Sequence, residues 1–113
     1  MSKILIIYRS QYGATKSYAT YLADRVGAVV KSYKDVKKKD IIDANTIIFG
    51  GGVYISKLAI LKTVKRFQPL LESKKLYLFA VGLTDTSFEA MPRIEAANSD
   101  IFGYHFKEVF YFP

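Results

Sequence analysis

The 113-residue sequence contains no cysteine and a single histidine, His105. Without cysteine the chain can form no disulfide, thiolate zinc site, iron–sulfur cluster or thiol nucleophile. One histidine leaves little for metal binding, so we expect no metal centre. His105 has no carboxylate in an evident motif, and the Ser, His and Asp residues are too scattered to suggest a catalytic triad. The chemistry of the chain must therefore come from another source.

Long apolar runs are absent as well. The N-terminal stretch MSKILIIYRS has one lysine and an apolar run of five residues, which is too short for the core of a signal peptide. Nowhere do about 18 apolar residues follow one another, the length that predicts a membrane-spanning helix. We therefore expect a cytoplasmic protein without a transmembrane segment.

Glycine and proline are few, with seven and three residues, whereas half of the residues are hydrophobic. This composition excludes a disordered or collagen-like chain and is typical of a globular protein. The length is that of one domain, which we place over residues 1–113.

Positive charge is concentrated in the first two thirds of the chain. Residues 1–75 carry 15 Lys and Arg against 5 Asp and Glu, whereas residues 76–113 carry 2 against 5. Such a balance could attract nucleic acid, anionic lipid or an anionic small molecule. The lysine-rich run KSYKDVKKKDIIDAN (31–45) has no aromatic residue besides Tyr33 and no nucleic-acid-binding motif. We interpret it as a solvated loop or short helix, and nucleic acid is not an expected partner.

Five apolar runs bounded by turn residues predict strands at 3–8, 28–33, 46–51, 75–82 and 107–112. The first, third and fourth runs are nearly continuous, as in parallel strands that helices cover on both faces.

Helical patterns lie between these runs. Residues 14–26 repeat apolar side chains every four positions at Tyr18, Leu22 and Val26. Residues 58–71 show a similar repeat at Leu61, Val64, Phe67 or Gln68, and Leu71. A weaker pattern covers about 87–97 and contains Pro92. Right-handed βαβ units then predict a doubly wound five-stranded parallel sheet of order 2-1-3-4-5.

The first strand passes into the first helix through the short turn SQYG, residues 10–13. In this fold, ligands bind beyond the carboxyl ends of the strands where strand order reverses. There Ser10 and Thr15 offer hydroxyls, Gly13 lets a ligand approach the backbone, and the helix presents unpaired N–H groups. These features suit a phosphate, although Ser10 could instead only cap the helix. No GxxxxGK[ST] or GxGxxG motif is present, which disfavours a nucleoside triphosphate or a dinucleotide.

Two further strands end in small or polar residues at the same edge of the predicted sheet. The third ends in GGGVYISK, where glycines permit close approach of a flat ligand and Tyr54 could stack on it. The glycines could instead relieve crowding, with Tyr54 in the core. The fourth ends in VGLTDTSF, which is again small and polar. Asp85 in this motif could equally serve only to cap the following helix. Three ligand-suited loops at one edge favour a binding site.

With SQYGATKSYA, IIFGGGVYISKLAILK and LFAVGLTD at these spacings, nearly the whole chain resembles the flavodoxin-like proteins. It is most similar to the flavodoxin-domain branch that includes quinone-dependent protoporphyrinogen oxidase. The resemblance implies FMN as cofactor, a phosphate loop after the first strand, and two loops that enclose the flavin ring. The implied phosphate loop comprises Ser10, Gln11, Tyr12, Gly13, Ala14 and Thr15, and the implied ring contacts are Gly51, Gly52, Val53, Tyr54, Gly82, Leu83, Thr84 and Asp85.

The resemblance implies a redox protein that transfers electrons or hydride through FMN, including a quinone-dependent oxidoreductase as one form. No side chain needs to be catalytic. Tyr12 replaces a hydroxyl residue of flavodoxins proper, and the basic charge contrasts with their acidity. The other hypothesis is a binding or oligomerisation module that has lost the flavin. Because the family continues into a last helix beyond FYFP, we expect an uncovered apolar face near Val109 and Tyr111, or their neighbours, and self-association.

Overall fold

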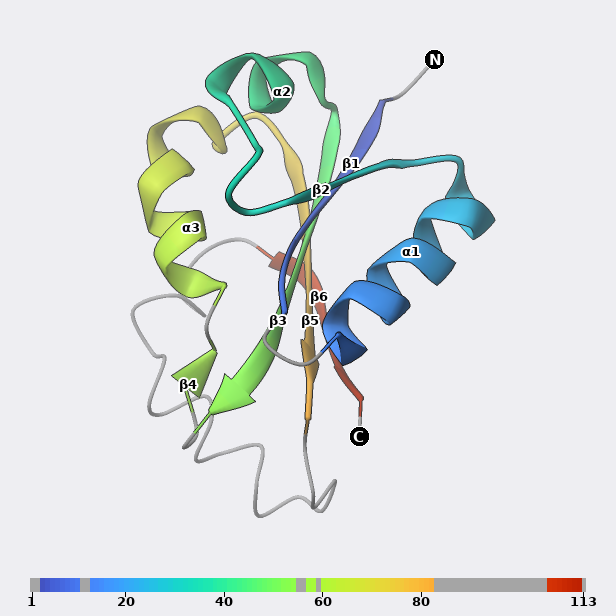
Figure 1. Cartoon of the computed structure of the whole chain (residues 1–113). Coiled ribbons are helices and arrows are strands. Elements are labelled where there is room, and N and C mark those ends of the chain that lie inside the picture. The colour runs from blue at the N-terminus through green and yellow to red at the C-terminus, as the bar shows by residue number, and fades with distance from the viewer. Residues whose placement is uncertain (1–2, 11–12, 55–56, 59, 83–105, 113) are drawn as a thin grey trace.

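The computed structural model describes residues 3–10, 13–54, 57–58, 60–82 and 106–112. Five strands form a parallel sheet in the order β2-β1-β3-β5-β6, and the short strand β4 pairs antiparallel with the end of β3 (Figure 1). When the short β4 is left out, β5 and β6 are the fourth and fifth strands of the sheet, so the order is the predicted 2-1-3-4-5. The prediction of a doubly wound, flavodoxin-like fold is confirmed. The strands are β1 (Ile4–Arg9), β2 (Val29–Ser32), β3 (Thr46–Tyr54), β4 (Lys57–Leu58), β5 (Lys75–Val81) and β6 (Phe106–Phe112).

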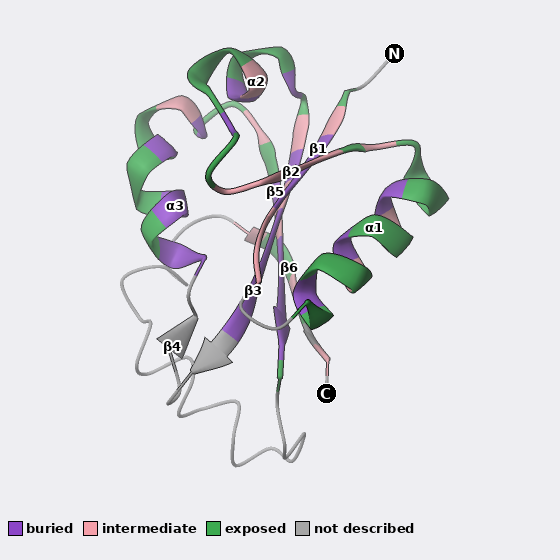
Figure 2. Ribbon diagram, in the orientation of Figure 1, coloured by how far each residue is buried: buried purple, intermediate pink, exposed green. Residues whose placement is uncertain are grey.

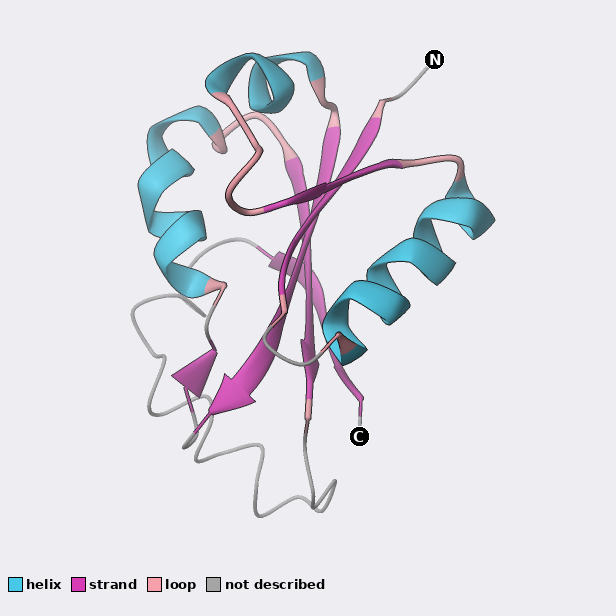
Figure 3. Cartoon of the chain, viewed as in Figure 1, coloured by secondary structure: helices cyan, strands magenta, loops and turns pink. Residues whose placement is uncertain are grey.

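Helices cover the two faces of the sheet unequally (Figure 3). Helix α1 (Ala14–Val26) packs on one face, whereas α2 (Lys38–Asp43) and α3 (Leu61–Phe67) pack on the other, followed by the 3-10 turn η1 (Gln68–Leu70). The predicted helix over 87–97 lies outside the described residues. No helix in the described part of the chain is long and apolar enough to cross a membrane.

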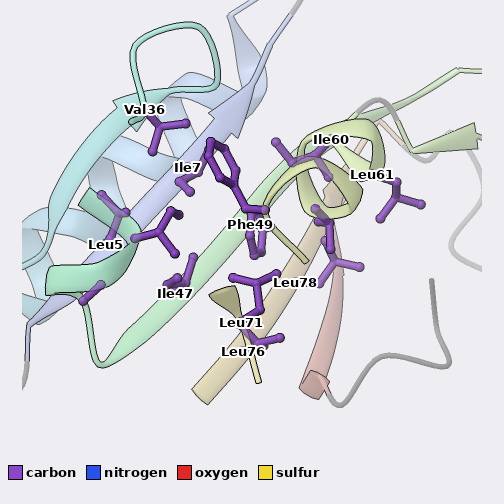
Figure 4. Packing of buried hydrophobic residues seen from close by; sticks show 14 of the residues in the cluster. Leu5, Ile7, Val36, Ile47, Phe49, Ile60, Leu61, Leu71, Leu76 and Leu78 are labelled. Carbon is purple, nitrogen blue, oxygen red and sulfur yellow. The ribbon is translucent and has the colours of Figure 1, made fainter. Parts of the chain in front are cut away.

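The core divides into two clusters because consecutive strand residues point to opposite faces. On the α2–α3 side, Phe49, Ile47 and Leu78 are fully buried at the centre of the larger cluster (Figure 4). On the α1 side, Ile6 and Phe79 pack with small residues of the helix. The central strands are therefore buried on both faces, which explains why their sequences are almost continuously apolar.

Helix α1 has the predicted bounds but a different buried stripe. Its buried residues are Thr15, Ala19 and Ala23, whereas Val26 is 42% exposed and Tyr18 and Leu22 are half-buried. The predicted stripe of larger side chains is thus wrong at Val26. The small side chains at positions 19 and 23 occupy the line of closest contact, and Figure 2 shows the opposite side of the helix exposed.

Helix α3 is shorter than the predicted helix over 58–71. Its start is delayed because Leu58 pairs with Val53 in the β3–β4 hairpin. Its end comes before Pro69, which has no backbone N–H to donate to a carbonyl of the preceding turn, and the chain continues as η1. The predicted apolar stripe is confirmed, since the four side chains that it names, apart from the alternative Gln68, are buried: Leu61, Val64, Phe67 and Leu71.

Strand β6 presents different environments on its two faces. Val109 packs against the larger cluster on the α2–α3 side and is half-buried. Phe110 points to the α1 side, where it is 44% exposed. The exposed apolar side chain is thus a neighbour of Val109 rather than Val109 itself, because α1 packs mainly against β1, β2, β3 and β5. The side chain of Tyr111 lies outside the described residues.

Candidate functional site

Three of the predicted loops leave the sheet at one edge, from adjacent strands. In the register of the sheet, Arg9 pairs with Gly51, and Gly52 pairs with Val81. Ser10, the end of β3 and Gly82 therefore follow neighbouring positions, with strands spaced by about 4.8 Å. Figure 1 shows the three strand ends pointing to the same side of the molecule. The prediction that these loops lie together at one edge of the sheet agrees with this arrangement.

The turn after β1 is held by a hydrogen bond across its ends. The backbone N–H of Gly13 donates to Oγ of Ser10 over 2.9 Å. Gly13 has φ of 90°, a left-handed conformation that side chains rarely adopt, and a Cβ built there meets nothing within 4 Å. Glycine is thus required by the backbone angle, while the space beside it is open. Ser10 closes the turn without capping the first helical N–H groups.

The first turn of α1 retains the hydrogen-bond donors that a phosphate needs. Among the described residues no side chain caps this helix and no acidic residue lies in its first turn. The first helical acceptor is the carbonyl of Gly13, which receives both N–H and Oγ–H of Ser17 at 3.0 and 3.1 Å. The N–H groups of Ala14, Thr15 and Lys16 precede this bond, at the positive end of the helix dipole.

One of the predicted phosphate-loop side chains differs from the simple expectation. Thr15 is only 3% exposed, so its hydroxyl is not offered to solvent as the simple expectation requires. The positions of Gln11 and Tyr12 lie outside the described residues. Ser10 is half-buried and Ala14 is exposed at the start of the helix.

The glycines in the second half of β3 pack against the protein interior. A Cβ at Gly51 would lie 2.7 Å from Cβ of Ile60, and Gly52 is buried. Relief of crowding, the alternative reading of this motif, therefore accounts for Gly51. Val53 and Tyr54 continue β3 and form the hairpin with β4. Their side chains lie outside the described residues, so the predicted stacking of Tyr54 stays a prediction.

The end of β5 turns sharply at Gly82. Its φ is 100°, and its N–H donates to the carbonyl of Phe112 over 3.2 Å. Gly82 is exposed at the edge where the other two loops leave the sheet. Leu83, Thr84 and Asp85 lie outside the described residues.

An aromatic and cationic group beside the turn was missed by the sequence reasoning. The guanidinium of Arg9, at the end of β1, lies 4.6 Å from the ring centre of Tyr33, and Nζ of Lys34 lies 5.9 Å from it. The N–H of Tyr33 donates to the carbonyl of Tyr8 over 2.8 Å, which fixes this segment beside β1. The signal was present, because Arg9 and Tyr33 follow adjacent strands. Within the described residues no cluster of three metal-ligating side chains occurs.

Comparisons with known proteins agree with the observed fold. The family model described as "Flavodoxin domain" matches residues 5–112, and no match was found among curated protein sequences. A flavoprotein from Lactobacillus acidophilus in complex with FMN shares 16% identity at a TM-score of 0.75, covering 98% of this chain and 93% of the other. The two-electron reduced flavodoxin of Megasphaera elsdenii shares 19% identity at a TM-score of 0.70, covering 96% of this chain and 85% of the other. A flavodoxin from the domain Archaea shares 19% identity at a TM-score of 0.64, covering 96% of this chain and 82% of the other.

The fold and the three loops at the carboxyl edge define a flavodoxin-like α/β protein. The chain belongs to the flavodoxin-domain family. The residues of the first turn fit a bound phosphate, since Gly13 leaves open space beside the start of α1.

Proposed function

We propose that this chain binds FMN and acts as a redox protein. The observation that carries the proposal is the start of α1, where the first N–H groups of the helix have no partner among the described residues and follow a left-handed Gly13 with open space beside it. A helix start of this kind favours a dianionic phosphate through hydrogen bonds and through its dipole. When bound, FMN supplies the electron or hydride chemistry.

The residues of the chain position the cofactor in this proposal. Backbone N–H groups of Ala14 and Thr15 hold the phosphate, and Ser10 fixes the turn that aims them. The end of β3 and the segment after Gly82 flank the ring, because these segments follow adjacent strands. No side chain is assigned as a catalytic acid or base.

Within this function, the residue pattern of the chain favours a quinone-dependent oxidoreductase over a soluble electron carrier. The turn SQYG carries Tyr12 in place of a second hydroxyl residue, a pattern similar to the branch that includes quinone-dependent protoporphyrinogen oxidase. The net charge of +7 also differs from the acidity of carrier flavodoxins. We place this activity in the cytoplasm.

The visible absorbance spectrum of the purified chain tests the proposed function. We expect flavin bands, present on isolation or restored by added FMN, that bleach on reduction with dithionite and return in air. A well-folded protein that stays colourless after incubation with FMN and gel filtration would contradict the proposal. That result would favour a binding module that has kept the fold without the flavin.

A further inference from the structure

The net positive charge of the chain comes from one stretch of its sequence. Residues 31–75 carry 11 of the 17 Lys and Arg residues and 4 of the 10 Asp and Glu residues, so they hold the whole net charge of +7. The remainder of the chain is neutral in sum. Residues 31–75 include α2 and α3, which cover the same face of the sheet.

The cationic side chains on these helices and on the segment just before α2 are exposed to solvent. We call this surface the basic face; its exposed members are Lys34, Lys37, Lys38, Lys39, Lys62, Lys65 and Arg66. Among the described residues the one ion pair is Lys31 with Asp40, at 3.0 Å, and neither belongs to this set. Helix α3 contains no acidic residue. Exposed Asp35 and Asp43 lie in the same part of the chain, so the basic face offers a partner an excess of positive charge.

The basic face reaches the edge of the sheet at which the candidate site lies. Helix α3 begins beside the ends of β3 and β4, so Lys62 lies in the turn nearest to that edge (Figure 1). Lys34 follows β2 and lies 5.9 Å from the ring centre of Tyr33, which also contacts Arg9 at the end of β1. A partner seated on this surface would thus be adjacent to the loops proposed to hold the flavin.

We propose that the basic face docks an acidic electron-transfer protein. Complementary charge accelerates encounter and orients the partner, and the seven exposed cations of the basic face lie in the stretch of the chain that carries a net charge of +7. A second copy of the chain does not fit this surface, because like charges would oppose each other. The identity of the partner as a redox protein rests on the proposed function, whereas its acidity follows from the charge pattern.

Binding of an acidic plant-type [2Fe–2S] ferredoxin, used as a probe, tests the proposal. The association rate is measured by surface plasmon resonance at low and high salt, with basic cytochrome c as the probe of opposite charge. The face variant is Lys38→Glu, Lys62→Glu and Lys65→Glu together. The control variant is Lys3→Glu, Arg25→Glu and Lys107→Glu together, which changes the net charge equally at exposed positions outside residues 31–75. Circular dichroism checks that both variants fold.

We expect ferredoxin to bind and cytochrome c not to bind. The face variant should associate at least about tenfold more slowly than the unchanged chain, an effect that high salt removes, while the control variant changes the rate much less. Equal slowing by both variants would overturn the proposal, because it would show attraction by net charge alone. Failure of ferredoxin to bind would also overturn the proposal. So would a face variant that loses binding to phosphatidylglycerol vesicles but keeps its association rate with ferredoxin.

The assay is run with and without FMN, so that the two proposals are tested separately. Ferredoxin binding that persists in a chain unable to take up FMN would contradict the proposed function and leave the docking surface standing. A chain that binds FMN and shows no affinity for ferredoxin would contradict the docking surface alone.

Discussion

The ring of Phe79 lies against the backbone of Gly50, its register partner on the neighbouring strand, so closely that a Cβ at residue 50 would overlap the ring. Both residues are buried on the α1 side of the sheet. The glycine thus lets a large aromatic ring fill space above β3. This contact also keeps the ends of β3 and β5, which carry two of the predicted site loops, close together.

Gly50→Ala is expected to destabilise the fold by about 1–3 kcal/mol, the usual cost of overpacking a core. Urea unfolding followed by circular dichroism measures the loss. The double variant Gly50→Ala with Phe79→Leu should cost less than the sum of the two single changes, because the smaller side chain makes room. Strictly additive losses would show that the ring does not limit residue 50.

Gly13→Ala is expected to weaken FMN binding by straining the turn that aims the first N–H groups of α1. The left-handed conformation costs a residue with a Cβ about 1–2 kcal/mol. Gly27→Ala is the matched control, since Gly27 ends the same helix with φ of 67° and equally open space. Both changes should lower the unfolding midpoint in urea, whereas the affinity from flavin fluorescence should fall only for Gly13→Ala. A similar loss of affinity in both variants would argue against a site at the start of α1.

Asp40 stabilises the start of α2 in a pH-dependent way. Its carboxylate accepts the N–H of Lys37 at 2.8 Å and binds Nζ of Lys31 at 3.0 Å, and these contacts lower its pKa from the ordinary value of 3.8. Because the folded pKa is the lower one, the stabilisation is present above about pH 4 and is lost as pH falls through the folded value.

Asp40→Asn should therefore reduce stability at neutral pH, with a difference from the unchanged chain that shrinks below pH 3.8. Thermal unfolding at a series of pH values measures this difference. Asp43→Asn, an exposed carboxylate on the same helix, serves as the control and should change stability little. A constant difference across the acid range would mean that the charge of Asp40 contributes nothing.

Phe110 is the side chain through which we expect the chain to self-associate. It is 44% exposed on the α1 side of β6, and apolar surface removed from water contributes about 25 cal/mol per Å². Phe110→Ser should shift the chain toward monomer in sedimentation equilibrium. Ile42→Ser, at an apolar residue 59% exposed on α2, should leave the distribution unchanged. If the unchanged chain is already monomeric, the predicted self-association is wrong.

The strand order and the bounds of α1 could be predicted because apolar runs and helical periods alternate along the chain. The stripe of α1 could not, since periodicity identifies large apolar side chains, whereas close packing on the sheet selects Ala19 and Ala23. The β3–β4 hairpin was also missed, because Lys57 and Leu58 carry no alternating pattern of their own. In both places tertiary packing, rather than the local sequence pattern, determines the structure.

The candidate site was predicted in part for similar reasons. The need for glycine at position 13 follows from a tight βα turn, and its φ of 90° agrees with that reasoning. The role of Gly51 could not be read from sequence, because its close neighbour Ile60 is nine residues away and reaches it through the fold. The Arg9–Tyr33 contact, by contrast, was within reach of the sequence, because the predicted strand order already placed β1 beside β2.

Comparison of FMN with riboflavin tests the central claim most directly, because the two differ by the phosphate alone. Each is titrated into the apoprotein and followed by flavin fluorescence. We predict that FMN binds at least about a hundredfold more tightly, since hydrogen bonds to a charged group contribute about 1.5–3 kcal/mol each and two or more are available at the start of α1. Equal affinity for FMN and riboflavin, or no binding of either, would contradict a phosphate site formed by Ser10, Gly13 and the first turn of α1.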